Sequence, residues 1–363
     1  MKKIKVIAEK EKKPGVTYVV AANGLELPVI DITHPEFYVK PDEEQLRALE
    51  KEYLANEKKT AKIPGFLRNI IISLMLKSSI IGRGLLASNG TFLSGMNTYI
   101  LKLAPGMLGK GYAKNLDRIM VKSLAGMSIR LRLQDMARFM ADALAPLLEK
   151  NPSAPLHFVN IAGGPSMDSI NTLILLNKEK PGTLLGREVK IHILDMDTEG
   201  PAFAVDALKA LQSDGAALNG LKAEALVTRY DWSDAAALGQ YIRANVPEDA
   251  LTAVSSEGGL FDYCADDILF ADMKAIYGAT PANTILAGTL TRGDGTGRTM
   301  NKTSGALTIS RGVEEFSVKA FNTGWAVEKS VARPLSIVML MVRVTPPGGG
   351  TLKVYQPTHR SPE

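Results

Sequence analysis

Five short apolar runs, each followed by a helix-like segment, dominate the chain after residue 155. They lie at 156–162, 189–196, 223–230, 251–256 and 284–290. Strands that alternate with helices in this way form a parallel sheet covered on both faces, which explains why the runs are apolar throughout. Two further β-rich runs, at 324–332 and 335–344, follow each other too closely for a crossover helix. The sequence therefore predicts an α/β fold with a mostly parallel sheet and a terminal antiparallel pair.

The first 150 residues differ from the rest of the chain in composition and in expected secondary structure. Residues 1–40 contain two extended runs around Asn23-Gly24, which predicts a small β extension with a hairpin. From 41 to 150 the chain is rich in Leu, Ala, Lys and Glu and opens with Pro41-Asp42-Glu43-Glu44, so we expect a helical cap. Its last helix, 128–150, places apolar residues near one face: Leu131, Met136, Phe139, Met140 and Leu144. The sheet domain then occupies 151–345, and 346–363 is expected to be a loose tail.

Composition and charge narrow the class of protein. With 45% hydrophobic and 22% charged residues and a formal charge of +5, the chain is typical of a soluble globular protein. The basic cluster from Lys2 to Lys13 is interleaved with glutamates and lacks aromatic residues, so a nucleic-acid groove is not expected. The longest apolar stretch, 70–76, is far shorter than the roughly 18 residues that span a bilayer. The sequence therefore predicts no transmembrane segment.

The cysteine and histidine residues bear on the cellular location of the protein and on whether it has a metal site. The single cysteine, Cys264, excludes an internal disulfide and fits a reducing compartment, so a cytoplasmic protein is expected. The four histidines show no metal-ligand spacing, and no protein metal site is expected. His157 and His192 fall inside predicted strands and are expected to be core residues.

The stretch "LHFVNIAGGPSMDSINTLILL", residues 156–176, predicts a strand, a tight turn and a helix. The turn, Ala162-Gly163-Gly164-Pro165, has small residues that let the backbone approach a ligand closely, and Asn160 comes just before it. Amides at the start of the next helix can receive an anionic group, and Ser166 or Asp168 can cap that helix. The spacing fits neither the dinucleotide fingerprint nor the phosphate loop. A nucleoside with an amino-acid tail and no phosphate fits better.

The ends of the next three strands also carry polar residues, and ligands of such sheets bind beyond the carboxyl ends of the strands. Asp195 ends the second strand, where a carboxylate can accept from the two hydroxyls of a ribose, and Met196 follows it. Asp231 could accept from an adenine amino group and Trp232 could pack near the base; the alternative is a helix cap with a core tryptophan. The fourth strand is followed by the remaining candidates: Glu257, Gly258, Asp262 and Tyr263.

The order of these motifs resembles the class I S-adenosylmethionine-dependent methyltransferases. The resemblance covers about 150–345 and implies a Rossmann-like sheet of seven strands with an antiparallel C-terminal strand. It also implies S-adenosyl-L-methionine as cofactor, a second-strand acid that holds the ribose, and no metal. Departures from the family pattern are Asn160 in place of an acid, the Ala-Gly-Gly-Pro turn and a long interval between Gly164 and Asp195.

A narrower resemblance follows from "SIRLRLQDM", "FVNIAGGPSMDS" and "SSEGGLFDY". These segments are similar to the leucine carboxyl methyltransferase-like family, which includes O-methyltransferases of polyketide pathways. The resemblance implies that Arg130 or Arg132 reaches a carboxylate of the cofactor or the acceptor, with Arg130 preferred, and that Glu257 lines the cofactor site. Tyr263 and Asp262 are the candidate catalytic residues. The expected activity is O-methylation, carboxyl or hydroxyl, of a small acceptor, and an apolar acceptor is compatible with it.

Two other functions stay open at this point. The altered first motif is compatible with a catalytically degenerate methyltransferase fold that serves as a binding or scaffold module. A nicotinamide-dependent oxidoreductase is disfavoured because the third glycine of the dinucleotide fingerprint is missing. The Met-rich helical segment from 59 to 145 could act as a lid over an apolar acceptor, as a homo-oligomer surface or as a peripheral membrane contact.

Overall fold

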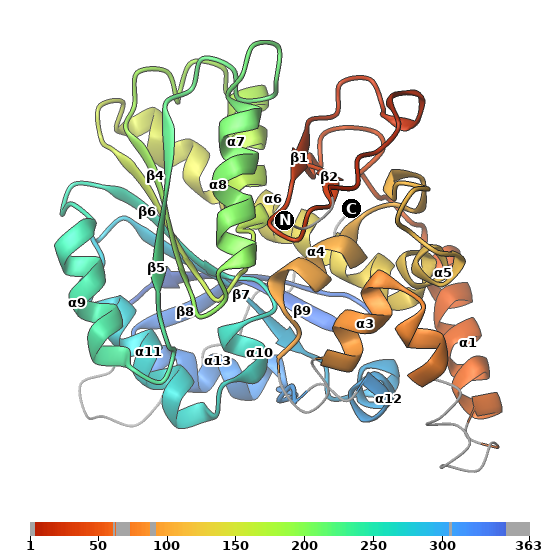
Figure 1. The fold of residues 1–363 in the computed structure, drawn as a ribbon. Coiled ribbons are helices and arrows are strands. Elements are labelled where there is room, and N and C mark those ends of the chain that lie inside the picture. Colours follow the sequence, from red (N-terminus) through yellow and green to blue (C-terminus); the bar gives the residue numbers. More distant parts are fainter. Residues whose placement is uncertain (1–3, 61, 63–72, 88–91, 305–306, 346–363) are drawn as a thin grey trace.

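The computed structural model describes residues 4–60, 62, 73–87, 92–304 and 307–345 (Figure 1). The tail expected at 346–363 lies outside them. The strands are β1 (Tyr18–Val20), β2 (Glu26–Pro28), β3 (Leu156–Ile161), β4 (Val189–Asp195), β5 (Ala223–Arg229), β6 (Leu251–Ser256), β7 (Thr284–Thr291), β8 (Trp325–Ala332) and β9 (Ser336–Arg343). The helices of the N-terminal half are α1 (Glu43–Thr60), α3 (Ile80–Ala87), α4 (Gly95–Lys102), α5 (Asn115–Lys122) and α6 (Leu124–Lys150). Those of the C-terminal half are α7 (Met167–Glu179), α8 (Glu199–Leu211), α9 (Ala235–Asn245), α10 (Leu260–Tyr263), α11 (Asp266–Ala279), α12 (Gly295–Ser304) and α13 (Val313–Phe321).

Seven strands form one sheet in the order β5-β4-β3-β6-β7-β9-β8. The first five are parallel, β9 pairs with β7 antiparallel, and β8 pairs with β9 antiparallel. The order reverses between β3 and β6, and this switch point is where doubly wound sheets bind ligands. The predicted Rossmann-like sheet with its antiparallel C-terminal strand is confirmed.

Helices cover both faces of the sheet, as apolar runs require (Figure 1). Along β3, Leu156 and Phe158 belong to the core shared with α6, α7 and α8. Val159 and Ile161 belong to the second core, which is shared with α9, α11 and α13. Because successive side chains of a strand point to opposite faces, the central strands supply apolar residues to both cores.

The N-terminal region packs against the first of these cores. β1 and β2 form the hairpin expected around Asn23-Gly24, with Tyr18 opposite Pro28. The second run is shorter than expected and ends as a strand at Pro28. Asn171 of α7 replaces the missing strand partners, because its side chain accepts from Ile32 N at 2.8 Å and donates to Ile30 O at 3.0 Å.

The helix expected at 128–150 begins earlier, at Leu124, because the Ser123 hydroxyl caps it by accepting from Gly126 N. Its five expected apolar residues are all buried: Leu131, Met136, Phe139, Met140 and Leu144. The helix contacts α7 and the strands β6, β7 and β9. The helix α6 was expected in the cap, but it packs on the sheet. Arg132 therefore projects from a helix that contacts the sheet next to the switch point.

Candidate functional site

The turn between β3 and α7 has an unusual backbone. Ala162, Gly164 and Ser166 all have positive φ, at 52°, 58° and 53°. A positive φ is uncommon for residues with a side chain, and such strained positions cluster at functional sites. Gly163 has no alternative residue, because a Cβ there would lie 2.2 Å from Oδ1 of Asn160. The two glycines of the turn therefore let Asn160 and Gly95 pack directly against its main chain.

A cavity of about 230 Å³ lies over this turn, at the carboxyl ends of the parallel strands. Ten of the residues expected to form the site line it: Ala162, Gly163, Gly164, Pro165, Asp195, Met196, Trp232, Glu257, Gly258 and Tyr263. They come from four different strand ends and lie together because the strands are parallel. The cavity is therefore the meeting point that the sequence predicts.

Asp195 links the turn to the end of β4. Its carboxylate accepts from Gly164 N at 2.9 Å and from Asp197 N at 2.8 Å, one bond to each oxygen. Burial raises the pKa of Asp195, while these two amides act in the opposite direction. Each carboxylate oxygen can accept a second bond, so the group can still receive a diol from the cavity.

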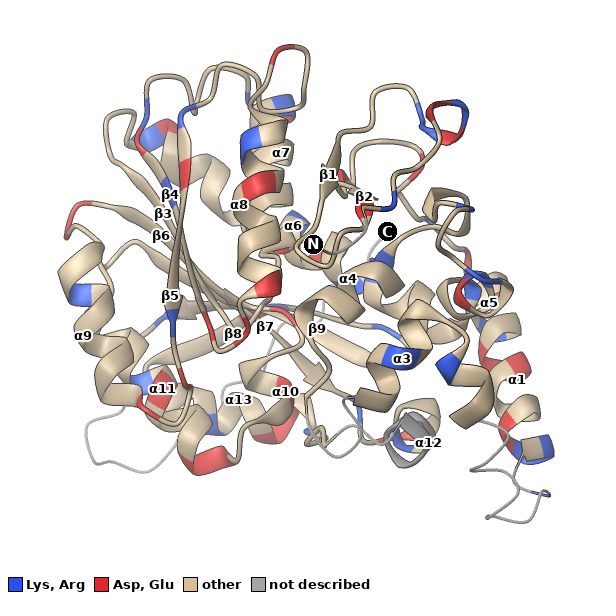
Figure 2. Ribbon diagram, in the orientation of Figure 1, with Lys and Arg blue, Asp and Glu red and all other residues tan. Residues whose placement is uncertain are grey.

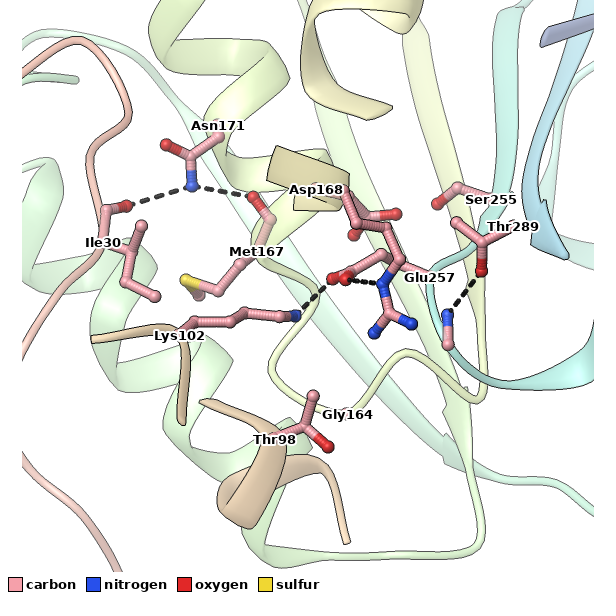
Figure 3. Close-up of polar contacts among 12 residues, drawn as sticks. Ile30, Thr98, Lys102, Gly164, Met167, Asp168, Asn171, Ser255, Glu257 and Thr289 are labelled. Carbon is pink, nitrogen blue, oxygen red and sulfur yellow. Dashed lines mark hydrogen bonds and ion pairs between the residues drawn. The ribbon is translucent and has the colours of Figure 1, made fainter. Parts of the chain in front are cut away.

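A buried charged cluster forms the inner end of the cavity, where Lys102 of α4 reaches Glu257 after β6 (Figure 3). Arg132 of α6 donates through Nε to the other oxygen of Glu257 at 2.8 Å. Burial alone would raise the pKa of Glu257, but the two cations outweigh burial and lower it. The cluster holds one carboxylate between two cations, and both signs of charge are available at the cavity's inner end.

Behind this cluster lies a second layer of polar groups that does not line the cavity. Asn160 donates through Nδ2 to Asp168 at 2.8 Å and to Ser255 at 3.1 Å. Burial and the nearby Glu257 raise the pKa of Asp168 to about 6. Asp168 therefore supports the turn from below, and neither it nor Ser166 makes the side-chain cap expected for α7.

Aromatic rings form the outer end of the cavity. The rings of Trp232 and Tyr263 are nearly parallel, with 12° between their planes and 6.4 Å between their centroids. Phe92 stands perpendicular to both, with its centroid 4.9 Å from Trp232 and 5.2 Å from Tyr263. Phe92 and Met196 are about half exposed, so the mouth of the cavity is apolar and open to ligands with flat rings.

Four expected site residues lie outside the cavity, which corrects their expected direct contacts. Asn160 is fully buried beneath the turn. Asp231 is exposed and accepts from Ser233, while the alternative expected there, a helix cap at Ser233 or Asp234, is made by Asp234, which accepts from Ala237 N. Asp262 is buried and accepts from Thr289 and Thr291 at 2.7 and 2.6 Å. Arg130 points away from the site and donates to the carbonyls of Val121 and Gly126.

The cap contributes cavity residues that were not expected individually from the sequence, although a lid was one of the roles expected for the segment at 59–145. Six cavity residues lie in the segment at 92–102: Phe92, Leu93, Ser94, Gly95, Thr98 and Lys102. Gly95 packs directly on the turn, because a Cβ on it would lie 2.6 Å from the Cα of Gly164. Gly95 and Gly164 are the sequence signal that could have indicated this contact, but nothing in the sequence near either glycine shows that the two meet. Tyr230, Asp197 and Gly259 complete the missed set.

The described residues also bear on metal binding and on membrane insertion. Among them, no group of three or more His, Cys, Asp or Glu is placed to hold a metal ion. Within the same part of the chain, no helix combines the length and apolar composition needed to cross a membrane.

No protein-family model matches the sequence, and no curated protein matches it. Solved structures do resemble it. A possible exported protein from Bordetella parapertussis is 16% identical with a TM-score of 0.53, over 83% of this chain and 96% of that one. A DUF574 family protein from Streptomyces avermitilis is 13% identical with a TM-score of 0.44, over 68% and 95% of the two chains.

A third similar structure is the 1,6-didemethyltoxoflavin-N1-methyltransferase from Burkholderia thailandensis, with bound 1,6-didemethyltoxoflavin and S-adenosylhomocysteine. It is 12% identical with a TM-score of 0.34, over 55% of this chain and 76% of that one. The strand order and the antiparallel C-terminal pair determine the architecture of this chain. This architecture is the seven-stranded Rossmann-like sheet with an antiparallel C-terminal strand that the resemblance of the sequence implied. At these identities the likeness concerns the fold, and the site has to be argued from its own residues.

Proposed function

We propose that this protein is an S-adenosylmethionine-dependent methyltransferase that acts on a small-molecule acceptor. The observation that carries the proposal is a single cavity shared by the turn after β3, Asp195 after β4, Trp232 after β5 and Glu257 after β6. Each strand end supplies a different kind of contact. A pyrophosphate fits less well, because the two cations beside the turn, Lys102 and Arg132, are already paired with Glu257.

The cavity offers a counterpart for each part of the cofactor. Asp195 retains acceptor capacity for the ribose hydroxyls. Trp232 and Met196 offer apolar surface for the adenine ring. The zwitterionic amino-acid end requires both signs of charge, and Glu257, Lys102 and Arg132 supply them beside the turn. The residues present therefore fit this cofactor.

Bound there, the cofactor supplies a methyl group already activated on a sulfonium, so the protein mainly has to align the acceptor and exclude water. Gly95 and its neighbours on the cap cover the turn and separate this part of the cavity from solvent. Tyr263 lines the cavity, and burial raises its pKa, so its hydroxyl is protonated at neutral pH and can donate a hydrogen bond to the acceptor.

We propose O-methylation, with a carboxyl acceptor as the simpler case. A carboxylate is already ionised and needs no general base, whereas a hydroxyl acceptor usually does. Asp262, the other expected catalytic residue, is engaged by Thr289 and Thr291 below the cavity and is assigned a supporting position. The cytoplasmic location expected from the single cysteine stays a prediction.

Calorimetry with S-adenosylhomocysteine tests the proposal. Asp195→Ala is expected to lower the affinity about 100-fold, because two charge-assisted bonds to the ribose are lost. Asp231→Ala is the matched control, since this acid follows the neighbouring strand but lies outside the cavity, and its affinity should stay unchanged. Absence of binding to the unmodified protein, or equal affinities of the two variants, would contradict the assignment.

A second candidate is a binding or scaffold module that keeps the architecture without catalysis. Asn160 stands where the family has an acid and is engaged beneath the turn, and the Gly95 contact covers Gly164. Both observations are compatible with a turn that no longer contacts a cofactor. Lack of any thermal shift with S-adenosylmethionine and S-adenosylhomocysteine would favour this candidate.

A further inference from the structure

Two segments of the helical cap, 73–87 and 92–123, expose charged side chains of one sign. Residues 73–87 and 92–123 expose or partly expose six basic side chains: Lys77, Arg83, Lys110, Lys114, Arg118 and Lys122. The acid in these two segments, Asp117, is buried and accepts from the main-chain amides of Ile81 and Lys114. Figure 2 shows the basic residues on α3, and both signs on α5, which contains Asp117, and on the neighbouring α1.

The same surface exposes large apolar side chains. Leu74, Met75 and Ile119 have 63%, 53% and 63% of their surface exposed. On α5, Ile119 lies one turn from Lys122 and on the same face as Asn115, so an apolar side chain is flanked by basic and polar ones. The Ile81 N to Asp117 bond of 3.0 Å joins α3 to α5, which makes the two helices one surface. We call this surface, formed by residues 73–87 and 110–122, the cap face.

We propose that the cap face docks on an anionic lipid surface. Basic side chains attract acidic headgroups, and exposed Leu, Met and Ile side chains insert at the boundary between headgroups and acyl chains. Among the described residues, none of these six basic side chains forms a salt bridge, so their charge is available to a partner. A nucleic acid fits less well, because it would require stacking aromatics in place of aliphatic residues.

Docking through the cap face would also determine where the cavity mouth lies relative to the lipid surface. Phe92, at the cavity mouth, is about half exposed and follows α3, a helix of the cap face, in the sequence. Docking would bring the apolar mouth near the lipid surface, from which an apolar acceptor could enter. The docking itself does not depend on the proposed function.

Flotation of the full chain with vesicles tests the proposal. Vesicles of phosphatidylcholine with added phosphatidylglycerol should bind the protein, pure phosphatidylcholine should not, and raised salt should release it. Lys114→Glu/Lys122→Glu is expected to lower binding at least about tenfold. The matched control is Arg243→Glu/Lys274→Glu, which makes the same change of charge at exposed positions of α9 and α11 and should bind as before.

A second pair of variants tests the apolar part. Ile119→Ser should weaken binding about fivefold, whereas Leu185→Ser removes an equally exposed residue outside the cap face and should have no effect. Absence of flotation, equal losses in the matched variants, or binding to a labelled single-stranded oligonucleotide without binding to lipid would overturn the proposal. Calorimetry with S-adenosylhomocysteine on the same variants reports separately on the cavity.

Discussion

Two clusters of buried polar side chains lie at different heights along the strands of the sheet, and only one of them borders the cavity. At the carboxyl end of β6, Glu257 is held between Lys102 and Arg132 and borders the cavity. Lower in the sheet, His157 and His192 contact each other at 3.0 Å, and His192 contacts the Tyr241 hydroxyl at 3.1 Å. The histidines are fully buried and border no described cavity. Burial therefore does not distinguish a site from a core; contact with a cavity does.

The largest expected effect concerns the charged cluster. Glu257→Gln leaves Lys102 and Arg132 buried without a counter-charge, which should cost about 3–5 kcal/mol in the free energy of unfolding. Urea denaturation at neutral pH measures this loss. The control is Glu179→Gln, which breaks the half-exposed pair with Arg138 and should cost less than about 1 kcal/mol. A similar cost for both variants would contradict the description of the cluster.

The histidine pair should make stability depend on pH. The pKa of His157 and that of His192 are lowered from 6.5 to about 4, and burial is the largest cause for both. The folded state therefore prefers the neutral forms, and the stabilisation is complete above pH 6.5 and is lost as the pH falls toward 4. The loss should reach up to about 3 kcal/mol per histidine. Urea denaturation at several pH values measures it.

Substitution of the pair identifies the source of this dependence. His157→Gln/His192→Gln should flatten the fall in stability below neutral pH, whereas His34→Gln, a change in a loop of the N-terminal extension, should leave it unaltered. An unchanged slope in the double variant would assign the dependence to the carboxylates instead.

Two arginines of α6 sharpen the comparison further. Arg130 and Arg132 are two residues apart and therefore lie on nearly opposite faces of the helix, and only Arg132 reaches the cluster. Arg132→Gln should lower the affinity for S-adenosylhomocysteine about 30-fold, as expected for loss of a charge-assisted bond near the ligand. Arg130→Gln removes bonds to two main-chain carbonyls and should leave affinity within about twofold. The reverse order, measured by calorimetry, would restore the preference that the sequence suggested.

The two tryptophans give the smallest expected effect. Trp232 lines the cavity, while Trp325 is fully buried and donates to Met273 O at 3.0 Å. Trp232→Ala should weaken binding of S-adenosylhomocysteine about tenfold, in line with the stacking energy of one base. Ligand-induced fluorescence changes should disappear in Trp232→Phe and persist in Trp325→Phe. Persistence of the signal in Trp232→Phe would place the adenine elsewhere.

The sheet could be predicted because its strands are patterned locally. Each of the seven runs was recognisable from β-rich apolar residues, and their order along the chain determined which ends meet. Asp195 and the 162–165 turn followed from the same reasoning, since residues after parallel strands share one edge. These predictions required no knowledge of contacts between distant segments.

The remaining parts depend on contacts that no local pattern encodes. Lys102 reaches Glu257 across 155 positions of sequence, and nothing near either residue indicates the other. The choice between Arg130 and Arg132 depended on the rotation of α6 about its axis, which tertiary packing determines. Asp231 and Asp262 were expected in the site because of position, but hydrogen bonds to Ser233 and to Thr289 direct them elsewhere.

A crystal structure of the protein with S-adenosylhomocysteine tests the central claim most directly. The account predicts ligand in the cavity, with ribose hydroxyls on Asp195, the adenine beside Trp232 and the amino-acid end at Glu257, Lys102 and Arg132. An empty cavity at saturating ligand, or the ligand bound away from the carboxyl ends of β3 and β4, would contradict it.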